Sequence, residues 1–183
     1  KIYEKKFGYV NWIGFWTLYK KEVLRFVKVI IQTVISPLVT SLLFLLVLSL
    51  AIGNDRGEVL GFSFITFLAP GLIAMQVIQQ GFSHSSSSIM IGKIQGNIVD
   101  ILYAPLTAGE ITLSINLAAC TRSVIIAAVS IIVFYFIVDL EFYSFYYIFI
   151  STFLGAFILS SIGIIIGLWA EKFDHMASAT NFI

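Results

Sequence analysis

Charged side chains are scarce in this sequence of 183 residues: they make up 11% of it, where an ordinary soluble domain has about 25%. With 59% hydrophobic residues, so few charges cannot cover the surface of a water-soluble globule. Cys120 is the single cysteine, which excludes a disulfide scaffold. The apolar composition excludes a disordered chain, and a formal net charge of +1 excludes nucleic acid as a bulk electrostatic partner. What remains is a protein that crosses a membrane several times.

Four uninterrupted apolar runs are each long enough to cross a bilayer as a helix, for which about 20 residues suffice. They cover residues 29–52, 60–82, 111–138 and 143–169. Because the runs are continuous rather than alternating, they predict helices and not barrel strands. Residues 176–183 turn apolar again, and we interpret them as the start of a fifth span in a chain cut there. The predicted fold class is therefore an all-α polytopic membrane protein.

Positive charge lies almost entirely on one side of these spans. Nine of the eleven Lys and Arg residues fall in the N-terminal segment, the segment 83–110 or the tail after residue 169. Arg56 is alone on the opposite side, and Arg122 lies within the third span. Since cytoplasmic loops are enriched in Lys and Arg, the sequence predicts a cytoplasmic N-terminus in a multi-pass protein of the inner (plasma) membrane.

The segment before the first span, residues 9–28, has the pattern of a basic amphipathic helix lying in the membrane interface. Its aromatic and apolar residues recur at steps of three and four: Trp12, Trp16, Tyr19, Val23 and Phe26. The basic residues recur on the other side: Lys21, Arg25 and Lys28. We expect this helix to lie on lipid of the inner leaflet; the alternative is a soluble helix packed on another domain.

Residues 83–110 form the longest polar interruption of the chain and contain a short apolar helix pattern over 96–104. Ile98, Ile101 and Leu102 share one face of it, with Asp100 opposite. Pro105 should end this helix because it lacks a backbone donor and restricts the residue before it. Thr107 and Glu110 then have the spacing of a capping box that opens the third span. An exposed apolar helix between two spans predicts a soluble protein partner that docks on it.

These residues resemble the permease subunits of ABC-2 type transporters, which export drugs, polysaccharides and lipids. The family pattern runs Gly-x-hydrophobic-x-acid-x-Leu-x-x-Pro-hydrophobic-Ser/Thr-x-x-Glu into the third span. Its counterparts here are Gly96, Ile98, Asp100, Leu102, Pro105, Leu106, Thr107 and Glu110. The resemblance covers essentially the whole chain. Many members have an Arg- or Glu-rich stretch where this chain has Gly92-Lys93-Ile94-Gln95, so the subfamily and the substrate stay open.

The resemblance implies one transmembrane domain over residues 1–183, paired with a second permease subunit as a homodimer. Each permease would dock one ABC ATPase subunit, which binds the ATP. No cofactor is expected on this chain, which has no G-x-x-x-x-G-K-[ST] motif. The implied coupling loop and helix covers 92–106. The residues implied to couple with the ATPase are Lys93, Gly96, Asn97, Ile98, Asp100, Ile101, Leu102, Pro105, Thr107 and Glu110.

Several polar residues fall within the spans, where they are costly and need partners. These are Arg122, Gln76, Gln79, Gln80 and Asn116. Two interpretations stay open: they line a substrate path or subunit interface, or they bond to one another between helices. Three glycines of the fourth span are expected to be close-packing positions: Gly155, Gly163 and Gly167.

No catalytic residue and no metal site is predicted. His84 stands among serines without a second ligand or a nearby acid, and is expected to mark the polar cytoplasmic end of the second helix. The alternative function is an integral-membrane lipid-modifying enzyme, but such enzymes need acidic or His clusters at a membrane face and the acids here are scattered. A third hypothesis is a self-contained channel, but a channel would have no use for the long polar segment 83–110.

Overall fold

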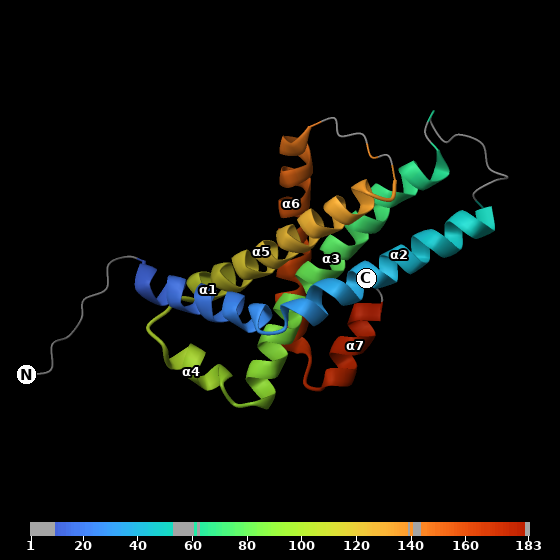
Figure 1. Ribbon diagram of the computed structural model, residues 1–183. Helices are drawn as coiled ribbons and strands as arrows, with labels where there is room; N and C mark the ends of the chain where they lie inside the picture. Colours follow the sequence, from blue (N-terminus) through green and yellow to red (C-terminus); the bar gives the residue numbers. More distant parts are fainter. Residues whose placement is uncertain (1–9, 53–60, 62, 139, 141–143, 182–183) are drawn as a thin grey trace, which may run out of the picture.

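The computed structural model describes residues 10–52, 61, 63–138, 140 and 144–181, and within these ranges the regular structure is entirely helical. Three long helices pack against one another: α3 (Phe64–Ile94), α5 (Ala108–Tyr135) and α6 (Phe145–Trp169). A fourth, α2 (Ile30–Ile52), lies along α3 (Figure 1). All four are long and apolar enough to cross a membrane, which confirms the all-α polytopic fold.

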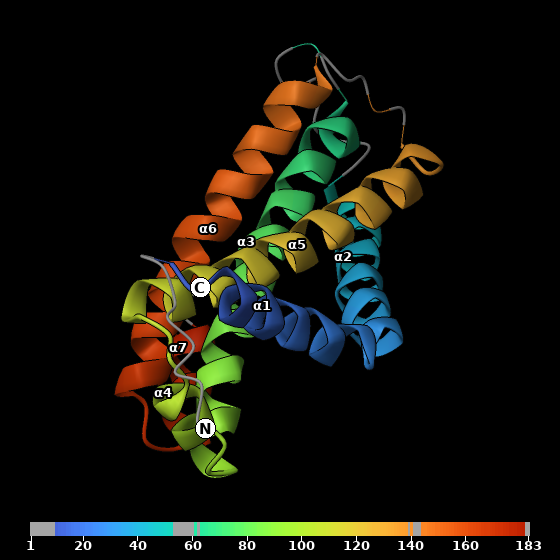
Figure 2. The same ribbon diagram turned by 90° about the vertical axis from the view of Figure 1, so that its left-hand side faces the viewer.

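Three shorter helices gather at one end of the bundle (Figures 1 and 2). They are α1 (Trp12–Val27), α4 (Ile98–Tyr103) and α7 (Phe173–Asn181). α1 runs along the first half of α5, α4 joins α3 to α5, and α7 packs near the end of α3. The end of α5 and the start of α6 lie at the opposite end.

Most ends of the observed helices differ by a few residues from the predicted span boundaries. The first predicted span, 29–52, is α2, the third, 111–138, is α5, and the fourth, 143–169, is α6. Residues 9, 60 and 143, which begin three predicted elements, lie outside the described residues. α7 covers most of the segment 176–183, which was interpreted as the start of a fifth span. The last two residues of that segment, 182–183, lie outside the described residues.

The second span differs most from its prediction, because the helix that contains it runs on to Ile94. The polar segment 83–94 is therefore helical, and the helix ends at Ile94 rather than at residue 82, where the predicted span ends. Its serines are compatible with a helix because their hydroxyls donate to carbonyls of the preceding turn. Ser86 Oγ donates to Phe82 O (2.8 Å), and Ser85 Oγ donates to the same oxygen (3.0 Å).

α3 and α6 approach each other closely through small residues, as is common between membrane helices. A Cβ at Gly163 would lie 2.7 Å from Phe82 O, and one at Gly167 would lie 3.0 Å from Ser86 O. Both glycines therefore occupy close-packing positions, as predicted. Gly155 does not: nothing lies within 4 Å of the Cβ it would carry.

α1 buries a different face from the one its aromatic pattern predicted. Its buried residues are Phe15, Leu18, Glu22 and Phe26. The predicted apolar face is split, because Phe26 is buried whereas Trp12 and Trp16 are exposed. The physical reason is that this stripe faces other helices: α1 packs along α5, where Phe15 O accepts from Ser114 Oγ, and Glu22 accepts from Ser88 Oγ of α3. The two tryptophans are left on the outside.

Candidate functional site

α4 is a short helix held between a glycine turn and a proline. Gly96 has a φ of +74°, a left-handed conformation that residues with a Cβ rarely adopt, and it separates α3 from α4. At the other end Ala104 is extended, with φ −64° and ψ 147°, as the residue before Pro105 should be. The helix is therefore slightly shorter than the predicted 96–104.

The inner side of α4 packs on the end of the bundle. Ile98 contacts a small apolar cluster contributed by α3, α5 and α6, which consists of Ile89, Ile111, Ile115 and Ile164. Ile101 is half-buried. This cluster fixes the position of α4 against the three long helices.

The outer side of α4 is apolar and uncovered. Val99 is 47% exposed, Leu102 69% and Tyr103 86%. The pattern at i, i+3 and i+4 forms one continuous strip, and Asp100 beside it is exposed as well. The prediction that Leu102 shares the face of Ile98 and Ile101 is wrong, because Ile98 and Ile101 turn toward the bundle and Leu102 turns away. We call Val99, Leu102 and Tyr103 the outer strip of α4.

One carboxylate joins the starts of two helices beside α4. Glu110 accepts hydrogen bonds from the Thr107 backbone N–H (2.6 Å) and hydroxyl (2.9 Å), and the Thr107 hydroxyl accepts from Glu110 N (3.3 Å). These bonds form the predicted capping box of α5. The other carboxylate oxygen, Oε1, accepts from the backbone N–H of Asn11 (2.5 Å), just before α1.

Asn11 completes this connection between α1 and the α4–α5 turn. Its side-chain oxygen accepts from Gly14 N (3.0 Å) and caps α1, while its side-chain nitrogen donates to Pro105 O (3.0 Å). Gly14 leaves room for Leu106, whose Cδ2 would lie 2.7 Å from a Cβ at that position. α1 and the α4–α5 turn are thus bonded and packed as one body. We call these contacts the Asn11–Glu110 clamp.

Lys93, predicted to face the ATPase, is used inside the chain. Its ammonium donates to the carbonyl oxygens of Leu168 and Ala170 (3.0 Å for Ala170), at the C-terminal end of α6. A cation at this position satisfies carbonyls that the helix leaves free and favours the negative end of its dipole. Gly96 and Asn97 are exposed in the turn before α4.

A buried ionic cluster connects α1 with α3. Glu22 is 2% exposed, and its carboxylate lies 3.1 Å from Arg25 Nη2 and accepts from Ser88 Oγ at 2.7 Å. Arg25 also donates to His84 O (3.1 Å), and His84 Nε2 lies 3.8 Å from the same carboxylate. Burial lowers the pKa of Arg25 below its ordinary value, and the charge of Glu22 partly opposes this.

Arg122 extends this cluster into α5. Its guanidinium donates to Gln80 Oε1 (2.5 Å), and its Nη1 lies 3.4 Å from His84 Nδ1. The cluster thus sets two guanidinium groups against one carboxylate among the described residues. Gln80 and His84 both belong to α3, so α3 supplies the polar groups beside Arg122. His84, expected at a polar helix end, is 1% exposed and central to the cluster.

Gln76 and Asn116 bond between helices. Gln76 donates to Pro37 O (3.1 Å) on α2 and accepts from Ser130 Oγ (2.7 Å) on α5. Asn116 accepts from Ser160 Oγ (2.5 Å) and donates to Ser161 Oγ (3.1 Å), which ties α5 to α6.

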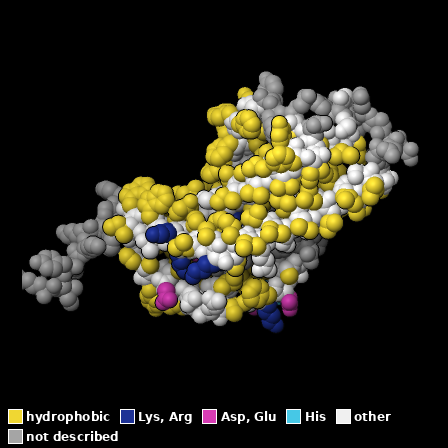
Figure 3. Space-filling view, in the orientation of Figure 1, with side chains coloured by type: hydrophobic (Ala, Val, Ile, Leu, Met, Phe, Trp, Pro, Cys, Tyr) yellow, Lys and Arg dark blue, Asp and Glu magenta, His cyan; other side chains and the backbone are white. Residues whose placement is uncertain are grey.

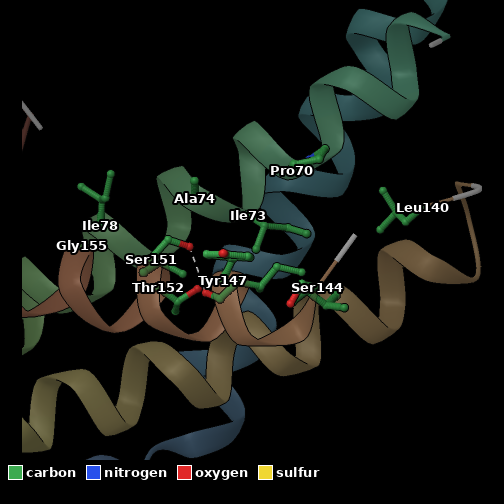
Figure 4. Close-up of a pocket in the computed structure, with 13 residues that line it drawn as sticks. Pro70, Ile73, Ala74, Ile78, Leu140, Ser144, Tyr147, Ser151, Thr152 and Gly155 are labelled. Carbon is green, nitrogen blue, oxygen red and sulfur yellow. Dashed lines mark hydrogen bonds between the residues drawn. The ribbon is translucent and has the colours of Figure 1, made fainter. Parts of the chain in front are cut away.

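Two cavities lie between the spans, and neither has a charged residue in its lining. The first, of about 290 Å³, lies between α2 and α3 and includes Gln76, Gln79 and Gln80 in its wall. The second, of about 440 Å³, lies between α3 and α6 near the end away from α4 (Figure 4). Tyr147 and Thr152 of α6 lie in it together with apolar residues of α3. Gly155 lines this cavity, which explains why it is not a close-packing position.

Sequence reasoning missed the ionic cluster and two of the three residues of the outer strip, Val99 and Tyr103. Glu22 was available as a signal, since it is a lone acid among basic residues, three positions before Arg25. Nothing local marks His84 as its neighbour, because that contact joins two helices far apart in the chain. Among the described residues no group of three or more His, Cys, Asp and Glu side chains could hold a metal ion.

Comparison with known proteins gives one family and a few relatives. The model of the ABC-2 type transporter family matches residues 13–183. The inner membrane transport permease YadH of Escherichia coli K12 is 27% identical over 175 residues, which is 96% of this chain and 68% of the relative. YadH of Shigella flexneri matches to the same extent. No solved structure matches the chain. Since the family model covers nearly the whole chain, with its four apolar helices, the protein is a membrane-spanning transporter subunit that belongs to the ABC-2 type transporter family.

Proposed function

We propose that this chain is the permease subunit of an ATP-driven exporter and that a separate ABC ATPase docks on α4. The observation that carries the proposal is the outer strip of α4, an uncovered apolar surface on a helix whose inner side is fixed. Exposed apolar surface of this kind favours burial against a partner. The sequence supplies no phosphate-binding loop of its own, which supports placing hydrolysis on that partner.

The anchoring of α4 supports a role in transmitting motion. A push on the outer strip would reach α5 through the Thr107–Glu110 capping box and α1 through Asn11. It would reach α3 and α6 through Ile98 and its cluster. A helix connected to four others is suited to turn closure of the ATPases into movement of the spans.

We place the N-terminus, α4 and α7 in the cytoplasm of a protein of the inner membrane, paired with a second copy as a homodimer. The positive residues of α1 and the name of the YadH relative support this placement. The substrate class is a drug, a lipid or a polysaccharide. Gln79 and the other polar groups of the uncharged cavity between α2 and α3 are our candidates for its path.

The test is ATPase docking with and without the outer strip. The full-length permease, co-expressed with a candidate ABC ATPase from the same genome, should co-purify with that ATPase and stimulate ATP hydrolysis in proteoliposomes. Leu102→Asp places a charge in the strip and should reduce both by about tenfold or more, as loss of a central interface residue does. Phe173→Asp is the matched control, because Phe173 is also exposed but lies on α7.

Unchanged co-purification and hydrolysis in Leu102→Asp would refute α4 as the docking site. Thermal unfolding of the variant in detergent should match that of the unsubstituted chain, because Leu102 contributes little to the bundle. A second variant replaces residues 96–104 by a Gly/Ser linker of equal length. Transport that survives this replacement would refute the coupling role itself.

A further inference from the structure

α1 leaves one side uncovered, and that side combines bulky apolar residues with lysines. On its buried side α1 packs along α5, and Glu22 accepts from Ser88 Oγ of α3; the residues buried there are Phe15, Leu18, Glu22 and Phe26. The exposed residues on the other side are Trp12, Ile13, Trp16, Lys20, Lys21, Leu24 and Lys28. Figure 3 shows the result as dark blue side chains beside a yellow area over α1. These residues line one shallow groove along the helix.

The positive charge of this side has no negative counterpart. Among the described residues, no ion pair involves Lys20, Lys21 or Lys28. Glu22 is the one carboxylate of α1, and it is turned inward to Arg25 and Ser88. Three ammonium groups therefore stay uncompensated on a helix that lies beside the membrane spans.

The arrangement matches a membrane surface in two ways. Tryptophan side chains prefer the depth of the lipid headgroups. Trp12 and Trp16 lie one turn apart on α1, and both line the groove. Lysines at the same level are attracted to a negative leaflet, because each ammonium gains electrostatic energy near acidic headgroups. Acidic and zwitterionic lipids both carry a phosphate, but the zwitterionic headgroup also carries a positive charge that cancels it. The net charge of the headgroup therefore decides how strongly the lysines are attracted.

We infer that the outer side of α1 binds the headgroups of acidic phospholipids and discriminates against zwitterionic ones. This inference goes beyond the proposed transport role, because the binding requires neither an ATPase nor a substrate. An acidic soluble protein would offer similar charge, but the packing of α1 against the apolar helices α5 and α2 favours lipid as the occupant.

The experiment measures which lipid quenches the fluorescence of Trp12 and Trp16. The full chain carries Trp169→Phe, so that these two remain as the only tryptophans. It is reconstituted in phosphatidylcholine vesicles that contain equal fractions of either brominated phosphatidylglycerol or brominated phosphatidylcholine. We expect the phosphatidylglycerol to quench with an apparent affinity about fivefold or more above that of phosphatidylcholine, which is the gain from about one lysine at the surface.

The triple substitution Lys20→Gln, Lys21→Gln and Lys28→Gln should bring this ratio close to one. Lys172→Gln is the control, because Lys172 is exposed at the same end but lies outside α1. The single variant Lys28→Gln, which should lower the ratio in part, keeps the test decisive if the triple variant folds poorly. Equal quenching by the two lipids, an unchanged ratio in the lysine variants, or no quenching by either lipid would each overturn the inference.

Discussion

Single glycines decide how closely α3 and α6 pack, and the same helix offers a matched comparison. A Cβ at Gly163 would collide with the Phe82 carbonyl and the Ser85 hydroxyl, whereas nothing lies within 4 Å of one at Gly155. We expect Gly163→Ala to destabilise the protein by about 1–3 kcal/mol through overpacking. Gly155→Ala should leave stability unchanged or raise it slightly, because alanine favours helix more than glycine does. Thermal unfolding of both variants in detergent checks this.

A lower unfolding temperature for Gly155→Ala than for Gly163→Ala would contradict the packing described for α6. Sequence reasoning could not have separated the two, because both glycines lie in the same apolar span with similar neighbours. Their difference depends on which side of α6 faces α3 at each level, and that is set by tertiary packing.

The same limit applies to the polar residues. The capping box of Thr107 and Glu110 was predictable, because both of its partners lie within four residues and follow a known spacing. The bond of Arg122 to Gln80 agrees with one of the two interpretations left open for the polar residues of the spans, whereas the bond of Glu22 to Ser88 was not anticipated and joins residues far apart in the chain. Hydrophobicity patterns contain no information about which helix faces meet, so the ionic cluster was not predictable from them.

At the scale of elements, the Asn11–Glu110 clamp joins α1 to the α4–α5 turn. Asn11→Asp keeps the side-chain oxygen that caps α1 but removes the donor to Pro105 O and brings a second carboxylate near Glu110. We expect the turn to loosen while α1 stays helical. Hydrogen exchange should therefore become several-fold faster at the Thr107 amide, which donates to Glu110.

Asn97→Asp is the control for this substitution, because the Asn97 side-chain nitrogen donates within its own turn, to Gln95. Its Thr107 amide should exchange as in the unsubstituted chain. Equal exchange in the two variants would show that the clamp does not hold the turn.

The positions of the helices in the sequence were predictable, but which side of each helix is buried and which is exposed was not. The four apolar runs identified α2, α3, α5 and α6 because length and hydrophobicity alone define a membrane span. The pattern of α1 identified a helix but assigned Trp12 and Phe26 to one face, since both fit steps of three and four. Only the contact with α5 separates the buried stripe from the exposed one.

At the scale of the whole molecule, the proposed topology places α4 and the α6–α7 turn on the cytoplasmic side and the start of α6 on the other. Cysteine labelling can test it in a Cys120→Ala background. In intact cells a membrane-impermeant thiol reagent should label Ser144→Cys and leave Leu102→Cys and Lys172→Cys unlabelled. Both of the latter should label after permeabilisation.

α4, which contains Leu102, and the α6–α7 turn, which contains Lys172, lie at one end of the bundle, and the start of α6, which follows Ser144, lies at the other. Labelling of Leu102→Cys in intact cells would reverse the orientation and remove α4 from the reach of a cytoplasmic ATPase. Labelling of Leu102→Cys and Ser144→Cys from the same side would contradict the arrangement of the spans as well.

Sharing the Glu110 carboxylate between two helix starts has a thermodynamic consequence. α1 and α4 belong to one bonded body, so a ligand that shifts the position of either helix changes the energy of the other. Linkage requires such effects to be reciprocal. If acidic lipid bound to α1 raises the affinity of the ATPase for α4, the ATPase must raise the affinity of lipid for α1 by the same factor. The lipid composition of the leaflet would then act as an allosteric effector of the ATPase.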